Sequence, residues 1–188
     1  KYTWEEARLL DRCLILHAEH GGGNNSTFAC RTITSSGSDT YSAIAAAIGA
    51  LKGPRHGGAN LRVVTMLDEL KATVKDHRDD DEIREYLKKL LRKEAGDRSG
   101  LIYGVGHAVY TLSDPRAEIL RAEAEAHADE YGMRDDYELL HAVERLAPEL
   151  LAPKMEGGNA ICANDDLYSG LIYRMLGIPS ELFTPIFA

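Results

Sequence analysis

The stretch "DDEIREYLKKLLRKEAG", residues 80–96, decides the fold class because it has the features of an amphipathic helix. Its acidic residues lie in the first turn and its basic residues in the last, which the helix dipole favours. Leu87 and Leu90 share a face and are candidates for the core. Gly96 is typical of a helix stop. The sequence therefore predicts a helix over residues 80–96.

Helical periodicity, bounded by residues typical of helix ends, extends in both directions from this stretch. Thr3 with Glu6 predicts a capping box at the start of one helix, and Asp114 with Pro115 predicts the start of another. Strand alternation is not evident in the sequence, so the predicted class is all-α, a multi-helical fold. The predicted helices cover residues 4–20, 40–52, 57–73, 80–96, 116–132, 136–147 and 165–177, with a break near Pro148 and one more helix from residue 179.

The composition is that of an ordinary globular protein, with 188 residues, 44% hydrophobic and 28% charged. The net charge of -8 argues against a nucleic-acid partner, because phosphate binding needs clustered Lys and Arg. Three widely spaced cysteines, Cys13, Cys30 and Cys162, fit neither a disulfide framework nor a zinc ribbon, so we expect a reducing, cytoplasmic setting. The sequence has no membrane-spanning run, and we expect no membrane partner. Because the first residue is Lys1 rather than Met, we expect the chain to be part of a longer protein.

The stretch "LHAEHGGGNNSTFA", residues 16–29, carries His17 and His20 where a predicted helix meets three glycines. Three positions apart on a helix, the two imidazoles share a face and could ligate one metal ion. The sequence lacks an HExxH motif, a Cys partner and an Asp-rich loop here. A substrate-facing role, or a structural role near the C-terminal helix dipole, is therefore favoured over a metal site.

Two further histidines lie beside glycines and are candidate functional groups on loops. His56 comes shortly after Pro54 and before two glycines in "LKGPRHGGAN", so its imidazole can stand at a loop tip with backbone packed closely around it. His107 follows a G-x-G in "YGVGHAVY". The G-x-G is not a dinucleotide fingerprint, because the third glycine and the preceding strand are both missing.

Arg116 and an acidic pair also carry possible chemistry. Arg116 falls in the first turn of its predicted helix, where a cation opposes the dipole, so it either holds an anion or pairs with Glu118 or Glu123. Asp165 and Asp166 stand at another helix start. Capping explains one of the two carboxylates and leaves the other for chemistry.

Four stretches, in this order along the chain, together resemble citrate synthase of the bacterial type: "LHAEHGGGNNSTFA", "LKGPRHGGAN", "GVGHAVYTLSDPRA" and "ICANDDLYSG". The resemblance implies the all-helical fold of that family, the small domain plus parts of the large one, from a parent that forms a homodimer. By this resemblance, residues 1–57 belong to the large domain, 58–177 form the small, closing domain, and 178–188 return to the large domain. The family's further carboxylate-binding arginines would lie beyond this chain, so we expect the chain alone to lack a complete oxaloacetate site.

The resemblance also implies a reaction, in which acetyl-CoA is condensed with oxaloacetate and citryl-CoA is hydrolysed to citrate and CoA. Asp166 then resembles the catalytic base, His56 the stabiliser of the enol or enolate, and His107 the group that polarises the ketone. Asp165 stands where the family often has Val. The residues that resemble oxaloacetate-binding positions are His20, Arg116 and, less directly, Asn24. Those that resemble CoA-contacting segments are Ile102, Tyr103, Gly104 and Asn164. Acetyl-CoA and CoA enter as co-substrate, with no tightly bound cofactor and no metal.

Three alternatives stay open. A 2-methylcitrate synthase shares these motifs but takes propionyl-CoA, and one methylene in an apolar pocket is worth only ~1 to 3 kcal/mol. A non-catalytic homologue would bind ligands or a partner helix without needing proton-transfer residues. A metalloenzyme with histidine ligands would lose activity to a chelator.

Overall fold

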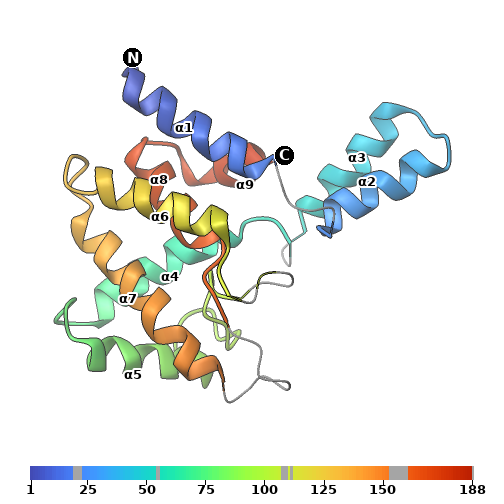
Figure 1. Ribbon diagram of the computed structural model, residues 1–188. Coiled ribbons are helices and arrows are strands. Elements are labelled where there is room, and N and C mark those ends of the chain that lie inside the picture. Colours follow the sequence, from blue (N-terminus) through green and yellow to red (C-terminus); the bar gives the residue numbers. More distant parts are fainter. Residues whose placement is uncertain (19–22, 54–55, 107–109, 111, 153–160, 188) are drawn as a thin grey trace. The chain divides into compact units, whose positions relative to one another are not determined.

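The computed structural model describes residues 1–18, 23–53, 56–106, 110, 112–152 and 161–187. Within these ranges every regular element is a helix, and the strand-like pairing is limited to an isolated antiparallel bridge between Val105 and Ala163 (Figure 1). The prediction of an all-α fold is confirmed. The chain divides into two compact units, one of residues 1–59 with 178–188 and the other of residues 60–177.

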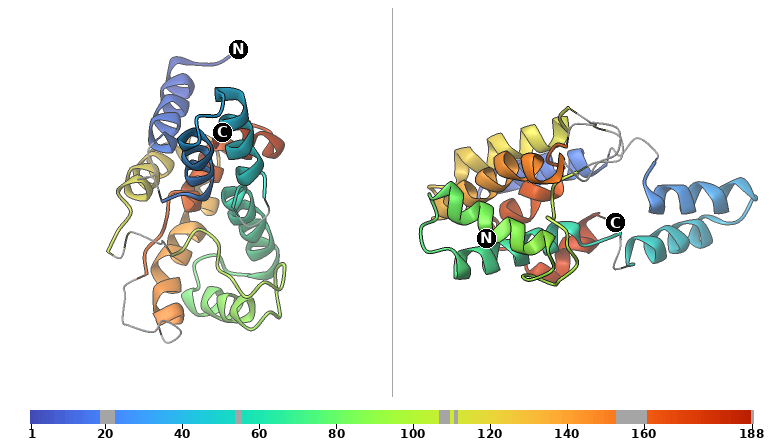
Figure 2. Two further views of the ribbon diagram at one scale, coloured as in Figure 1. Left: turned by 90° about the vertical axis from the view of Figure 1, so that its right-hand side faces the viewer. Right: turned by 90° about the horizontal axis from the view of Figure 1, so that it is seen from below.

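The first unit contains helices from both ends of the chain: α1 (Trp4–His17), α2 (Asn25–Ser35), α3 (Thr40–Leu51), the 3-10 turn η2 (Ser180–Leu182) and α9 (Phe183–Phe187). The predicted capping box of Thr3 and Glu6 is present at the start of α1. Helix α2 was not predicted. It starts at Asn24, whose side chain accepts hydrogen bonds from the backbone N–H groups of Ser26 and Thr27. Helices α2 and α3 lie side by side as a hairpin, as Figures 1 and 2 show.

The second unit is built around α8 (Asp166–Met175), which is buried on nearly all sides. Helices α6 (Pro115–His127) and α7 (Arg134–Leu151) both pack on it. Helices α4 (Ala59–Thr73) and α5 (Asp80–Leu91) complete the set. The aromatic and aliphatic side chains of α8 that are fully buried are Leu167, Tyr168, Leu171, Ile172 and Tyr173. Since these buried side chains lie on several faces of the helix, α8 is the core element of this unit.

Helix α5 ends earlier than predicted, at Leu91 rather than near Gly96. Arg92 closes the last turn, and Lys93 turns the chain aside with a φ of 64°. The predicted core positions Leu87 and Leu90 are buried, so the face of the helix was correctly predicted although its end was not.

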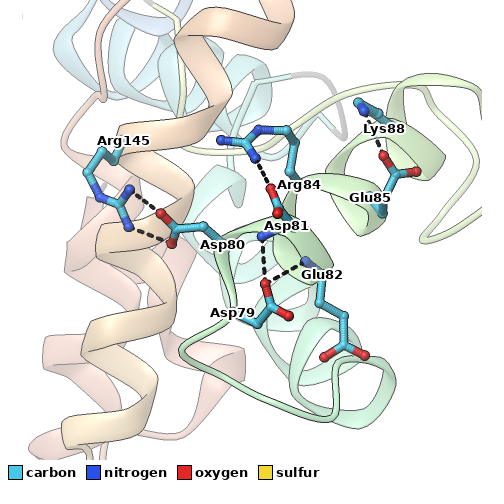
Figure 3. A network of polar contacts seen from close by, with 8 residues as sticks. All are labelled: Asp79, Asp80, Asp81, Glu82, Arg84, Glu85, Lys88 and Arg145. Carbon is cyan, nitrogen blue, oxygen red and sulfur yellow. Dashed lines mark hydrogen bonds and ion pairs between the residues drawn. The ribbon is translucent and has the colours of Figure 1, made fainter.

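An ion pair fastens the start of α5 to α7 (Figure 3). The guanidinium of Arg145 donates to both carboxylate oxygens of Asp80, at 2.6 and 2.7 Å. Asp79 caps the same helix by accepting from the N–H groups of Asp81 and Glu82. The acidic run thus starts one helix and also ties it to another.

The predicted break at Pro148 is wrong, because α7 continues through Pro148 to Leu151. A proline in a helix removes one backbone hydrogen bond, here to the carbonyl four residues earlier. Leu146 and Ala147, the two residues before Pro148, are buried in the core. Their burial offsets the lost hydrogen bond, so that the helix survives to its end.

Candidate functional site

The candidate residues fall in both units, and each group is described within its own unit. In the first unit lie Asn24 and His56; in the second lie Ile102, Tyr103, Gly104, Arg116, Asn164, Asp165 and Asp166. His20 and His107, predicted to bind oxaloacetate and to polarise its ketone, lie outside the described residues.

The His56 imidazole is held by the first turn of α2. The backbone N–H of Ser26 donates to His56 Nε2 at 3.2 Å, and Ser26 Oγ lies 3.0 Å from the same nitrogen. Ser26 is placed in turn by Asn24, whose Oδ1 accepts from the Ser26 N–H at 2.9 Å. Because a backbone N–H can only donate, Nε2 acts as the acceptor, and a neutral ring then carries its proton on Nδ1.

Ser26, which contacts the candidate residue His56, was missed by the sequence analysis. Asn24, two positions before Ser26, caps a helix, and recognising this cap in the sequence would have pointed to Ser26. The capping role of Asn24 is observed, whereas its predicted contact with oxaloacetate stays a prediction.

The two glycines after His56 meet the predicted need for closely packed backbone. A Cβ on Gly57 would lie 2.0 Å from the Leu51 carbonyl oxygen and 2.9 Å from Thr184 Cγ2, so no side chain fits there. Gly58 has a φ of +83°, in the left-handed region that favours glycine. The backbone on the C-terminal side of His56 is therefore fixed by two positions that require glycine.

In the second unit, hydrogen bonds join the segment before His107 to the segment before Asp166. The Gly106 N–H donates to the Cys162 carbonyl at 2.7 Å, and the Asn164 N–H donates to the Gly104 carbonyl at 3.0 Å. Asn164 Nδ2 adds a bond to the Gly106 carbonyl at 2.8 Å. Two of the four sequence stretches are thus held together by main-chain pairing and one amide side chain.

Gly104 is required where these segments meet α8. Its φ is +79°, and a Cβ there would lie 2.8 Å from Leu167 Cα. Ile102 is buried, so any ligand contact of this segment would rest on its main chain.

The Tyr103 side chain is engaged in a polar cluster of its own. Its hydroxyl donates to Asp97 Oδ2 and accepts from Arg62 Nη1 at 3.1 Å. The Arg62 guanidinium also lies over the Tyr103 ring, 5.4 Å from its centroid. Hydrogen bonds from Ser99 and Tyr103 lower the pKa of Asp97 to about 2.

The helix start at Asp165 and Asp166 is capped differently from the prediction. Neither carboxylate caps α8; instead Asn164 Oδ1 accepts the Asp166 N–H at 3.1 Å. Asp165 is buried and forms an ion pair with Arg116, its Oδ1 lying 3.1 Å from Nη2. The expectation that one of the two acids serves as a cap is therefore wrong.

Arg116 is bound by the residue that caps its own helix. Its Nε and Nη2 donate to the two oxygens of Asp114 at 3.1 and 2.8 Å, and Asp114 also accepts the Arg116 backbone N–H at 2.9 Å. Asp114 and Asp165 were not among the partners predicted. Asp114 is a second residue whose role the sequence analysis missed, because the sequence indicated only that it begins a helix.

The environment of Asp166 raises its pKa. Burial is the largest cause and the charge of Asp165 the second, while Arg116 and a hydrogen bond from the Asn60 backbone N–H oppose them, and the result is a pKa of about 7. Asn60 lies in the first turn of α4, where the helix dipole favours a nearby anion. A carboxyl group with such a pKa can both accept and hold a proton near neutral pH.

The described residues also bear on the metalloenzyme alternative and on the expected absence of a membrane-spanning segment. No group of three His, Cys, Asp or Glu residues there is arranged to hold a metal ion. The His17 ring packs against Phe187, with ring centroids 3.8 Å apart. None of the described helices has the length and hydropathy to cross a membrane.

Comparison with known proteins gives one consistent family. Residues 1–188 match the family described as citrate synthase, C-terminal domain. A citrate synthase of Deinococcus radiodurans is 45% identical over 186 residues, which are 99% of this chain and 45% of that protein. A citrate synthase of Synechocystis sp. is 41% identical over 182 residues, 97% of this chain and 41% of that protein.

Solved structures agree with these relatives. The crystal structure of citrate synthase from Thermotoga maritima matches with a TM-score of 0.79 and 34% identity, over 99% of this chain and 46% of that one. The ternary complex of carboxymethyl coenzyme A and oxaloacetate with citrate synthase from Thermoplasma acidophilum matches with a TM-score of 0.80 and 30% identity, over 100% of this chain and 45% of that one. The chain spans somewhat less than half the length of these relatives.

Proposed function

The chain belongs to the citrate synthase family, and from this we propose that the protein containing it condenses acetyl-CoA with oxaloacetate and hydrolyses citryl-CoA to citrate and CoA. The observation that carries the proposal is the carboxyl group of Asp166, whose pKa is raised to about 7 beside the buried cation Arg116. Carbon-carbon bond formation needs a base for the acetyl methyl proton and a cation for the keto acid. Both groups are present within one unit of this chain.

In this proposal Asp166 removes the methyl proton of acetyl-CoA. The base must be ionised to accept a proton, and a pKa close to the working pH gives both an ionised fraction and a useful basicity. The Asn60 N–H, which donates to the carboxylate, orients it and favours its ionised form. A positioned base of this kind contributes ~10²- to 10⁴-fold to the rate.

His56 stabilises the enol or enolate that proton removal creates. With Nε2 accepting from Ser26, the proton on Nδ1 is the one offered to the thioester oxygen. A preorganised donor at a developing oxyanion is worth ~3 to 4 kcal/mol. His107 polarises the ketone of oxaloacetate, while Arg116, His20 and Asn24 hold the keto acid. CoA contacts come from the main chain of residues 102–104 and from Asn164.

We also propose that the two compact units are parts of the family's two domains. Residues 1–57 and 178–188 would belong to the large domain and residues 58–177 to the small, closing domain. The observed division, residues 1–59 with 178–188 and residues 60–177, supports these bounds.

The proposed parent is a cytoplasmic homodimer whose citrate enters the tricarboxylic acid cycle. Exposed apolar side chains on the α2–α3 hairpin support a partner surface: Phe28, Tyr41, Ile44 and Ile48. On α3 three of them follow the spacing of one helix face. Cys13, Cys30 and Cys162 are free thiols, as in a reducing compartment.

The test is thiol release by the full-length protein. We expect CoA to be released from acetyl-CoA in the presence of oxaloacetate, more slowly from propionyl-CoA, and from neither without the keto acid. Asp166→Asn should lower kcat by ~10²- to 10⁴-fold and leave oxaloacetate binding intact. Asp136→Asn, which changes another buried carboxylate that is paired with Lys71, is the matched control and should retain activity.

Two outcomes would contradict the proposal in different ways. Faster release from propionyl-CoA would assign the protein to the 2-methylcitrate reaction. A folded protein that releases no thiol from either thioester would be a non-catalytic homologue.

A further inference from the structure

The start of α4 lies against the first turns of α8, beside Asp166. The backbone N–H of Asn60, in the first turn of α4, donates to the Asp166 carboxylate. Gly170 permits this close approach, because a Cβ there would lie 2.8 Å from the Asn60 carbonyl oxygen and 2.5 Å from Val64 Cγ2. Asp166 and Gly170 are one turn apart in α8 and therefore share a face of that helix. The proposed base is thus held at a helix N-terminus, where the dipole favours negative charge.

The Asn60 side chain carries a second donor at the same place. Asn60 is 1% exposed, and its Oδ1 accepts the Leu61 N–H at 2.8 Å. A backbone N–H can only donate, so the amide atom that faces Leu61 is the oxygen, and the other atom is the nitrogen. Within the described part of the chain, Asn60 Nδ2 is buried and has no hydrogen-bond partner. Because buried amide donors are nearly always paired, this one is a candidate for contact with a bound ligand.

The other polar atoms of Asn60 already serve the structure. The backbone N–H holds Asp166, and Oδ1 satisfies the Leu61 N–H in the first turn, where a helix leaves its N–H groups without internal partners. Nδ2 takes part in neither contact. The amide nitrogen is therefore the part of Asn60 that the fold does not account for.

A ligand that reaches Asp166 also comes to the Asn60 amide, because the two residues are in contact. Asp166 keeps part of its surface exposed, so a ligand can approach it. In the proposed reaction Asp166 meets the methyl carbon of acetyl-CoA, and the acyl oxygen is on the carbon bonded to that methyl group. Removal of the methyl proton places negative charge on this oxygen. The charge thus develops close to a helix N-terminus and to a donor that has no other partner.

We propose that Asn60 is a further catalytic residue, whose side-chain Nδ2 donates a hydrogen bond to the acyl oxygen of the CoA substrate while Asp166 removes the methyl proton. The inference rests on the proposed function, because it takes Asp166 as the base. The methyl C–H bond breaks and its proton goes to the Asp166 carboxylate. The electron pair of that bond forms the C=C bond of the enolate, and the C=O π pair moves onto the acyl oxygen. Asn60 keeps its protons and stabilises the charge on that oxygen.

A donor that acts on a developing charge affects the rate more than substrate binding. The acyl oxygen of the bound thioester is neutral, and it becomes a strong acceptor only as the proton leaves. Interactions that strengthen in the transition state raise kcat, whereas uniform binding lowers KM. Loss of the Asn60 amide should therefore lower kcat and leave KM for acetyl-CoA almost unchanged.

The experiment compares the full-length wild type with Asn60→Ala, which keeps the main-chain N–H that serves Asp166 and removes only the amide. We expect kcat to fall ~10²- to 10³-fold, as when one donor to an oxyanion is removed, with KM for acetyl-CoA changed by less than about threefold. Carboxymethyl coenzyme A, the ligand of the Thermoplasma acidophilum complex, carries a carboxylate where acetyl-CoA has its acetyl group, and it reports the same contact without turnover. Its affinity should fall about tenfold or more in N60A. The affinity for CoA, which lacks the acyl group, should not change.

Two further variants separate the amide from the fold. Asn60→Ser keeps an oxygen that can accept the Leu61 N–H, but its hydroxyl is too short to replace the amide donor. It should lose kcat as N60A does, and it serves if N60A does not fold. Thr65→Ala, on the same helix, removes an exposed hydroxyl that donates to the Leu61 carbonyl and is the matched control. Its kcat and its affinity for carboxymethyl coenzyme A should equal those of the wild type.

An unchanged kcat in N60A would overturn the catalytic role of Asn60. Equal losses of affinity for carboxymethyl coenzyme A and for CoA would overturn it too, and would make Asn60 a support for the start of α4. If N60A selectively weakens the analogue while the wild type releases thiol from neither thioester, the condensation reaction is wrong and the oxygen-binding role of Asn60 stands. A wild type that binds neither carboxymethyl coenzyme A nor CoA would contradict both.

Discussion

Arg116 illustrates how the tertiary environment of a single residue overrides a local rule. A cation in the first turn of a helix is disfavoured by ~0.3 to 1 kcal/mol. Leaving one buried charge without its partner costs more, ~3 to 5 kcal/mol. The two carboxylates that Arg116 contacts therefore decide its position, and the helix dipole does not.

At the same scale, the raised pKa of Asp166 predicts how stability depends on pH. The ordinary pKa of an unfolded Asp is ~3.9, so between about pH 4 and 7 the folded state holds a proton that the unfolded state does not. The free energy of unfolding is therefore highest at low pH, as far as this group is concerned, and it falls as the pH rises through that window. Asp166→Asn removes the penalty, so its stability advantage over the wild type should grow by about 2 to 3 kcal/mol from pH 5 to pH 8.

Thermal unfolding of the full-length protein at both pH values measures this difference. Asp135→Asn is the matched control, since Asp135 is an exposed acid in the first turn of α7. Its stability difference from the wild type should be the same at pH 5 and pH 8. An equally constant difference for Asp166→Asn would show that Asp166 has an ordinary pKa.

At the scale of the helix, four capped starts were predicted, whereas two of the ends were not. The predicted starts of α1, α3, α5 and α6 agree with observed caps. Helix α5 ended early and α7 continued through its proline. A start is set by a side chain that bonds to N–H groups two or three residues away, whereas an end depends on what the last turn packs against.

The caps of α5 and α6 allow a matched prediction. Asp79 and Asp114 are both Asp caps, but Asp79 is exposed and Asp114 also holds the buried Arg116. We expect Asp79→Ala to lower the free energy of unfolding by about 1 kcal/mol and Asp114→Ala by about 3 to 5 kcal/mol. Urea unfolding of both variants in the full-length protein measures the difference. Equal losses would mean that the pairing of Asp114 with Arg116 adds nothing to stability.

At the scale of the whole molecule, the chain leaves its first unit and returns to it. Residues 60–177 form the second unit, and residues 178–188 belong again to the first. A glycine with positive φ lies at each crossing, Gly58 at +83° and Gly177 at +66°. Both connections use backbone conformations that other residues rarely adopt.

A charged residue introduced on the exposed apolar face of α3 is expected to weaken self-association. Ile48 in α3 is 48% exposed and Ile119 in α6 is 45% exposed, so the two are matched in residue type, exposure and secondary structure. We expect Ile48→Asp to weaken the proposed dimer of the full-length protein by tenfold or more, on the order of 1.4 kcal/mol, since it would place a charge in the proposed apolar interface. Ile119→Asp should leave the dimer unchanged. Sedimentation over a range of concentrations would show either result, and a dimer unaffected by Ile48→Asp would move the interface away from this face.

The sequence by itself determined the all-helical class, most helix starts, the core face of α5 and, through four ordered motifs, the family. These features depend on short-range spacing and on residue types, which can be read along the chain. Only the tertiary structure decided that Asp114 and Asp165 hold Arg116, that Ser26 holds His56, and that Asp166 has a raised pKa. The physical reason is that these features depend on burial and on contacts made by packing. Asp165 and Arg116, like Ser26 and His56, lie far apart in the sequence. Asp114 is only two residues from Arg116, but nothing along the chain shows that the pair is buried.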